Sequence, residues 1–340
     1  MNRLEKRTGT CSMISFSSFR FGVPHRALPL AARNASSTVH SVPRMRTLAQ
    51  IVLGLIALFI AISPSLGSQN KICTATGDLE IIPFESKVFP AARSLRVLLP
   101  PGYHAATNHG RKYPVLYLND GQNLFDVCTS MYTKYEWRVD ETVNELTARG
   151  EIPPMIVVGI DNGGRRLRPK EYLPYVDETL SPPEPDPQGK PYPQFLLNEI
   201  VPFIEGRYRV LPGSSHRALG GSSYGAGIAF YTIISRPGSF GGLLLESPSV
   251  YADNYHLLRD AESVHIWPQR VYIGTSTAND EPVEDVSKLK ALFQKAALSD
   301  DRLRVVFQDG GTHSEQWWAQ RLPSAIRFLF PTANTPTGHR

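Results

Sequence analysis

Short apolar segments alternate with helix-like segments along the chain from residue 94 to residue 330. The apolar segments are rich in Val and Leu, as buried strands are, and the segments between them carry apolar residues at helical spacing. This alternation predicts an α/β fold in which a mostly parallel sheet is covered by helices on both faces. The expected strands are 94–100, 113–119, 154–160, 216–221, 241–247, 270–276 and 302–309, and the expected helices are 136–150, 191–206, 224–235, 285–298 and 315–330, the last interrupted near Pro323.

The N-terminal part has a different character. Arg44 and Arg46 precede an apolar run from Leu48 to Ile62, and Pro64 and small residues follow. A basic region, a short apolar region and a small-residue site predict a secretory signal over about residues 45–67. A membrane anchor is the alternative, but the run is shorter than the roughly 20 residues that span a bilayer.

We therefore expect a leader at residues 1–68 and a single catalytic domain at residues 69–340, exported to the periplasm or the medium. No stable membrane anchoring is expected after cleavage. Because a secretory signal normally begins near the first residue, Met45 is a candidate for the true start of translation. A proline-rich stretch at residues 174–193 is expected to be irregular, either as a lid or binding loop or as a solvated insertion.

The excess of basic over acidic residues lies in the leader. The net charge is +5, but residues 1–68 hold eight of the 36 basic residues and one of the 31 acidic residues, so the remainder is slightly acidic. With no basic stripe in that remainder, nucleic acid is not an expected partner. Cys73 and Cys128 form either a disulfide or two separate buried thiols, and no Cys/His spacing predicts a metal or cofactor.

The segment LGGSSYGAG, residues 219–227, lies between an expected strand and an expected helix. It fits the pattern G-x-S-x-G only with Ser223 at the centre, which is the context of a nucleophile elbow. Such an elbow exposes the serine at the end of the strand, where the following helix favours developing negative charge. Ser223 is therefore the predicted nucleophile.

A nucleophilic serine needs a base and an acid, which follow it in the order acid, histidine in this type of fold. His313, in GGTHSEQWW, follows an expected strand and is the predicted base. Asp280 is the predicted acid because it follows the strand 270–276. Glu281 is the second choice and Glu246 the third.

The oxyanion hole needs two backbone N–H donors. The residue after the nucleophile, Tyr224, provides the first. The second is expected from Gln122, in the turn DGQN that follows the strand 113–119, although Asp-Gly is also an ordinary turn pair.

Four segments together resemble the enterochelin-esterase and esterase-D branch of the α/β hydrolases. They are LLPPGYHAATNHGRKYPVLYLNDGQNLFD, LGGSSYGAG, LLLESPSVY and GGTHSEQW, and the resemblance covers about residues 78–331. It implies an α/β-hydrolase fold and hydrolysis of a small-molecule carboxylic ester, with Ser223 as nucleophile and His313 as base. It also implies Asp280 as acid and Gln122 and Tyr224 as oxyanion donors.

Two other functions use the same scaffold: acyl transfer to a sugar or lipid hydroxyl, and ligand binding without catalysis. Trp137, Tyr172 and the loop 161–172 are candidates for the pocket lining. Arg165, Arg166 and Arg168 in that loop fit either an anionic substrate or a solvated surface.

Overall fold

A computed structural model describes residues 72–278 and 280–332 of the chain. The expectations for the leader and for the start codon therefore lie outside the described residues. Within these residues, no helix is long and apolar enough to cross a membrane.

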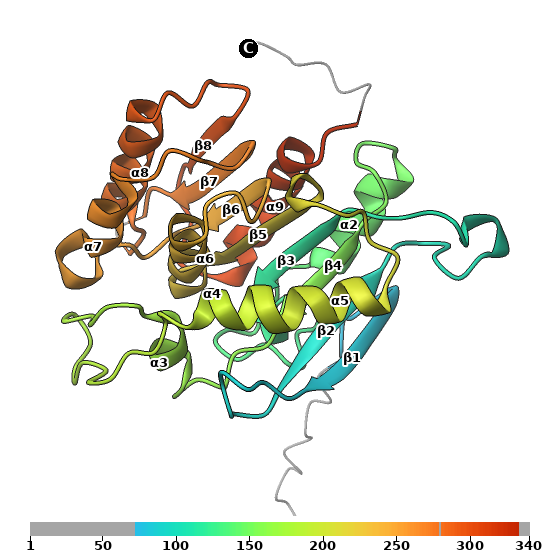
Figure 1. The fold of residues 1–340 in the computed structure, drawn as a ribbon, viewed down its shortest axis with the longest axis horizontal. Helices are drawn as coiled ribbons and strands as arrows, with labels where there is room; N and C mark the ends of the chain where they lie inside the picture. The colour runs from blue at the N-terminus through green and yellow to red at the C-terminus, as the bar shows by residue number, and fades with distance from the viewer. Residues whose placement is uncertain (1–71, 279, 333–340) are drawn as a thin grey trace, which may run out of the picture. The chain divides into compact units, whose positions relative to one another are not determined.

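The centre of the fold is an eight-stranded sheet (Figure 1), which confirms the predicted α/β architecture. Its order is β1-β2-β4-β3-β5-β6-β7-β8, and all pairs from β4 to β8 are parallel. The strands are β1 (Asp78–Phe84), β2 (Arg93–Leu99), β3 (Val115–Asn119), β4 (Ile156–Ile160), β5 (Arg217–Ser222), β6 (Gly242–Glu246), β7 (Arg270–Ser276) and β8 (Leu303–Gln308).

Helices cover both faces of the sheet. The helices are α2 (Val139–Ala148), α3 (Arg168–Tyr172), α4 (Tyr192–Phe195), α5 (Val201–Arg207), α6 (Tyr224–Ser235), α7 (Ala252–Ala261), α8 (Val283–Lys295) and α9 (Glu315–Leu329). One apolar cluster packs helices α4 through α8 against one face of the sheet. A second cluster packs α2 and α9 against the other face. Strand residues alternate between the two clusters, as Leu98 and Leu99 do, because successive side chains of a strand point to opposite faces.

The structure differs from the expected elements in several places, among them α3, which lies inside the expected loop 161–172. β1, which pairs antiparallel with β2 at the edge of the sheet, was not expected; its residues are half exposed and include Pro83. α9 continues through Pro323 instead of being interrupted there. The segment after α3 is irregular as far as Pro191, as predicted, and α4, the π-helical turn Leu196–Ile200 and α5 then follow without a break.

Candidate active site

Ser223 lies in a sharp turn between β5, which ends at Ser222, and α6, which begins at Tyr224. Its backbone has φ 55° and ψ −127°, a conformation that non-glycine residues rarely adopt. Gly221 makes the turn possible, because a Cβ there would lie 2.7 Å from the backbone of Gly225. The structure thus gives the LGGSSYGAG segment the strand–turn–helix geometry of a nucleophile elbow.

The strained serine is held by its neighbours. Its N–H donates to the carbonyl of Glu246 at 3.0 Å, and its carbonyl accepts from Ser249 N at 3.2 Å. Its Oγ lies 3.4 Å from Ser249 Oγ. Among the described residues, no hydrogen bond joins Ser223 Oγ to His313, and such catalytic bonds often form only when substrate is bound.

His313 lies in the loop between β8 and α9, with its side chain 28% exposed. Its ring packs edge-on against Trp318, with centroids 5.1 Å apart. Nδ1 of the ring lies 3.7 Å from Oε2 of Glu281, whose side chain is fully buried. The ring thus faces a carboxylate on one side, as a catalytic base does.

That carboxylate is not the one first expected. Asp280 is exposed, and its Oδ2 accepts from the backbone N–H of His313 at 3.3 Å, whereas the ring pairs with Glu281. Glu281, the second choice, reaches the ring because the turn after β7 directs it inward, where Thr275 Oγ1 donates to it at 3.1 Å. The structure therefore places Glu281, and not Asp280, beside the ring, and which of the two acts as the acid stays a prediction.

The surroundings of Glu281 favour its ionised form. Burial raises its pKa, but the opposing effects of the polar neighbours His313, Ser247 and Thr275 are larger and lower it overall. A buried carboxylate whose pKa is lowered can stabilise an imidazolium ring.

The third candidate acid, Glu246, has a different partner. Its Oε2 accepts from Arg321 Nε at 2.8 Å, and both side chains are buried. Burial raises the pKa of Glu246 to about 7 even though Arg321 opposes the shift. Arg321 also donates to Ser276 Oγ and Gln308 Oε1, so it links the ends of β6, β7 and β8.

The expected oxyanion turn lies beside the elbow. β3 pairs in parallel with β5, so Asp120 and the 3-10 turn Gly121–Asn123 follow the strand next to the one that ends at Ser222. Asn119 Nδ2 donates to the Gly225 carbonyl at 2.7 Å and joins the two turns. The N–H groups of Gln122 and Tyr224 each lie in the first turn of a helix, where backbone donors have no partner within the helix. The structure thus places both expected donors at the same end of the sheet.

Arg168, at the start of α3, fastens the oxyanion turn to the elbow. Its Nε and Nη2 donate to Asp120 at 2.8 and 2.7 Å, and Nη2 also donates to the Ser222 carbonyl at 3.2 Å. The side chains of Arg168 and Asp120 are only 11% and 5% exposed. Arg168 is therefore committed to the protein rather than to an anionic substrate.

Of the other residues expected to line the pocket, two arginines are exposed and two aromatic residues are buried. Arg165 and Arg166 are exposed, and the Arg165 guanidinium lies 4.9 Å from the centroid of the Tyr132 ring. Trp137 is buried in the core, where its ring packs against Trp318. Tyr172 is also buried, and its hydroxyl accepts from the backbone N–H of Asp120, so it supports the oxyanion turn from below.

The proline-rich segment reaches the elbow. Tyr224 donates its hydroxyl hydrogen bond to Asp177, which is completely buried although it lies in this segment. Tyr175, from the same segment, lines a small hollow together with Tyr224 and Ser249. The segment therefore packs onto the candidate site, as the lid or binding-loop alternative requires.

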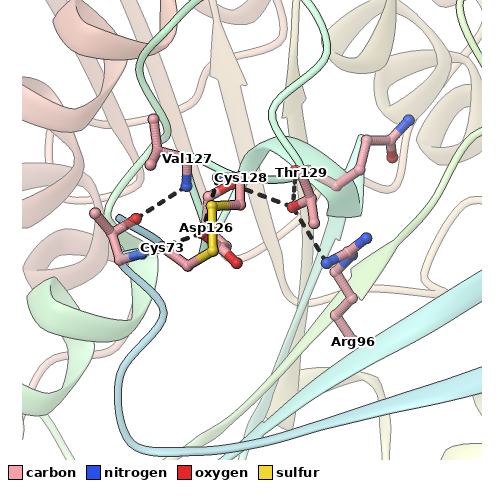
Figure 2. Close-up of a disulfide and its surroundings, with 8 residues drawn as sticks. Cys73, Arg96, Asp126, Val127, Cys128 and Thr129 are labelled. Carbon is pink, nitrogen blue, oxygen red and sulfur yellow. Dashed lines mark hydrogen bonds between the residues drawn. A yellow bond between two sulfur atoms is a disulfide. The ribbon is translucent and has the colours of Figure 1, made fainter. Parts of the chain in front are cut away.

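Cys73 and Cys128 form a disulfide, with their Cα atoms 5.1 Å apart (Figure 2). The sequence had left this pairing open. The next residue, Thr129, donates through its Oγ1 to the Gln122 carbonyl at 2.7 Å and accepts from Arg96 at 3.3 Å. The disulfide thus anchors the loop that contacts the oxyanion turn.

Comparisons with known proteins identify relatives of this chain. The family model described as "Putative esterase" matches residues 86–329. The uncharacterized protein YbbA of Bacillus subtilis is 23% identical over 253 residues, 70% of this chain and 92% of the relative. The siderophore enterobactin esterase of Emericella nidulans is 29% identical over 163 residues, 45% of this chain and 51% of the relative. The solved structure of the siderophore hydrolase EstB from Aspergillus nidulans has a TM-score of 0.56 at 18% identity, covers 77% of this chain and 98% of its own, and shows the shared fold.

Proposed function

Because the chain belongs to the putative-esterase family, we propose that it is an exported serine ester hydrolase that forms an acyl-enzyme on Ser223. Family membership makes the protein a carboxylic ester hydrolase. The observation that carries the proposed mechanism is the strained backbone of Ser223 at the junction of β5 and α6. Strain of this kind persists where function requires it.

In the proposed reaction, Ser223 Oγ attacks the ester carbonyl while His313 takes its proton. The N–H groups of Gln122 and Tyr224 stabilise the oxyanion, and Glu281 stabilises the imidazolium through Nδ1. His313 then gives the proton to the departing alcohol. Water, activated by the same ring, releases the acid and restores Ser223.

For the substrate, we propose a small-molecule ester with an aromatic or anionic acyl part. The exposed Arg165 and Arg166, together with Tyr132, offer cationic and aromatic contacts near the oxyanion turn. Relatives whose names refer to siderophores point in the same direction. A panel of short p-nitrophenyl esters, feruloyl sugars, acetylated sugars and a catecholate trilactone would identify the substrate, and an added alcohol would reveal acyl transfer.

Export is part of the proposal. It is supported by the short apolar run before Pro64 and by the disulfide, since disulfides persist in oxidising compartments. N-terminal sequencing of the secreted protein should give a mature chain that begins near Ser68. Recovery of residues 1–60 on the isolated protein would argue against cleavage.

The nucleophile is tested by labelling with a fluorophosphonate. Ser223→Ala should abolish both labelling and ester hydrolysis, because the elbow presents only this side chain. Ser222→Ala is the matched control, since Ser222 is the adjacent residue and is buried at the end of β5. Peptide mapping that places the adduct on Ser222 would disprove the assignment.

A further inference from the structure

A cluster of three carboxylates lies away from the candidate active site, at the start of α2. Glu136, Asp140 and Glu141 each bring one carboxylate oxygen within 4.8 Å of the others. Glu136 and Asp140 are 5% and 0% exposed. The proposed ester hydrolysis uses none of them.

Two carboxylate oxygens of this cluster have no hydrogen-bond partner. Asp140 Oδ2 accepts from the N–H and the Oγ1 of Thr76 at 2.6 and 2.8 Å. Glu136 Oε2 accepts from Arg138 N at 3.0 Å, and Glu141 Oε1 lies 3.5 Å from Arg138 Nε. Asp140 Oδ1 and Glu141 Oε2 are buried without any hydrogen-bond partner.

The local positive charge is too small to balance three carboxylates. Arg138 is 61% exposed, so solvent screens its charge, and the N-terminus of α2 adds only a partial charge. A buried carboxylate oxygen without a donor is costly unless it shares a proton or binds a cation.

We propose that Glu136, Asp140 and Glu141 bind a calcium ion. The ligand set contains only oxygen, which suits a hard cation and does not favour zinc or copper. Calcium accepts irregular geometry and six to eight ligands, whereas magnesium requires a nearly ideal octahedron. Water can complete the coordination from a hollow of about 660 Å³ lined by Glu136, Glu141 and Glu145.

The bound ion would join three parts of the chain. Asp140 already holds Thr76, in the segment that carries Cys73, while Glu136 ends the loop that carries Cys128. A cation on both carboxylates would fasten this disulfide-linked region to α2. The expected affinity is that of extracellular calcium modules, with a Kd of about 0.1 to 1 mM.

Binding is tested on the purified protein after chelation with EDTA. Addition of calcium to about ten times its Kd should raise the melting temperature by about 3 to 6 °C. Magnesium at the same concentration should have a much smaller effect. Terbium should bind at the same site and emit light sensitised by Trp137, which adjoins Glu136, and calcium should compete for it.

Three variants make the test specific. Asp140→Asn and Glu141→Gln should remove both the calcium response and the terbium signal, and Glu141→Gln keeps the test valid if Asp140→Asn folds poorly. Glu284→Gln is the matched control, because it removes an exposed carboxylate from the first turn of α8, as Glu141→Gln removes a carboxylate from the first turn of α2. An unchanged melting temperature with calcium in the wild-type protein, an equal response to magnesium, or equal losses in the control and the site variants would overturn the proposal.

Discussion

Removal of the Arg168 side chain should damage both stability and catalysis, and the structure gives the size of each effect. Arg168→Gln deletes two hydrogen bonds to Asp120 and one to the Ser222 carbonyl. Asp120 then keeps a hydrogen bond from Asn162 Nδ2 at 2.6 Å but loses its charged partner. Since a buried ion pair broken from one side costs about 3 to 5 kcal/mol, the melting temperature should fall by about 6 to 20 °C.

The catalytic effect follows from the position of Asp120. This residue, with φ 61°, begins the turn that presents the Gln122 N–H, so its displacement should misplace an oxyanion donor. Loss of one such donor typically lowers kcat by about 10²- to 10³-fold. KM should change little, because the donor acts mainly in the transition state.

A double-mutant cycle separates the two roles of the pair. If the stability loss comes from the unpaired Asp120 carboxylate, Arg168→Gln/Asp120→Asn should be more stable than Arg168→Gln alone, while kcat should stay low in both. Added guanidinium should partly restore the kcat of an Arg168→Ala variant, which a purely structural defect would not allow. Full kcat in folded Arg168→Gln would refute the reasoning.

Two further predictions concern the acid and the disulfide. Glu281→Gln should lower kcat by about 10²- to 10⁴-fold, because Glu281 faces the His313 ring. Asp280→Asn is the matched control and should change kcat little, since Asp280 meets only the backbone of His313. Equal losses of kcat in the two variants, measured by steady-state kinetics, would reject this assignment. The Cys73–Cys128 bond closes a loop with a sequence separation of 55, so Cys73→Ser/Cys128→Ser should cost about 2 to 4 kcal/mol in denaturant unfolding, and an unchanged midpoint would show that the bond is dispensable.

Features with a local signal could be predicted from the sequence. The parallel strands are continuous apolar runs, and Ser223 lies in a pattern whose strand and helix can both be recognised nearby. β1 escaped prediction because an antiparallel edge strand is half exposed and its burial does not produce such a run. Local signals therefore predicted the turn that presents Ser223 but not every strand.

Features that depend on distant contacts could not be predicted. Asp280 and Glu281 are adjacent carboxylates after the same strand, and only the path of the turn decides which one is buried beside His313. Arg168 meets Asp120 across 48 residues, and Arg321 meets Glu246 across 75. Neither pair leaves a pattern in the sequence, since a buried, paired arginine cannot be told from an exposed arginine by its sequence neighbours.

The strain at Ser223 leads to a last prediction. A non-glycine residue at φ 55° and ψ −127° costs about 1 to 3 kcal/mol, and the bonds to Glu246 and Ser249 hold it there. Ser223→Ala keeps the Cβ and the strain, whereas Ser223→Gly removes both but adds about 0.5 to 1 kcal/mol of backbone entropy to the unfolded chain. Ser223→Gly should therefore be at least as stable as Ser223→Ala, by up to about 2.5 kcal/mol in denaturant unfolding, although both are inactive. A more stable Ser223→Ala variant would mean that the elbow stores no strain and that this backbone conformation is not held in place for catalysis.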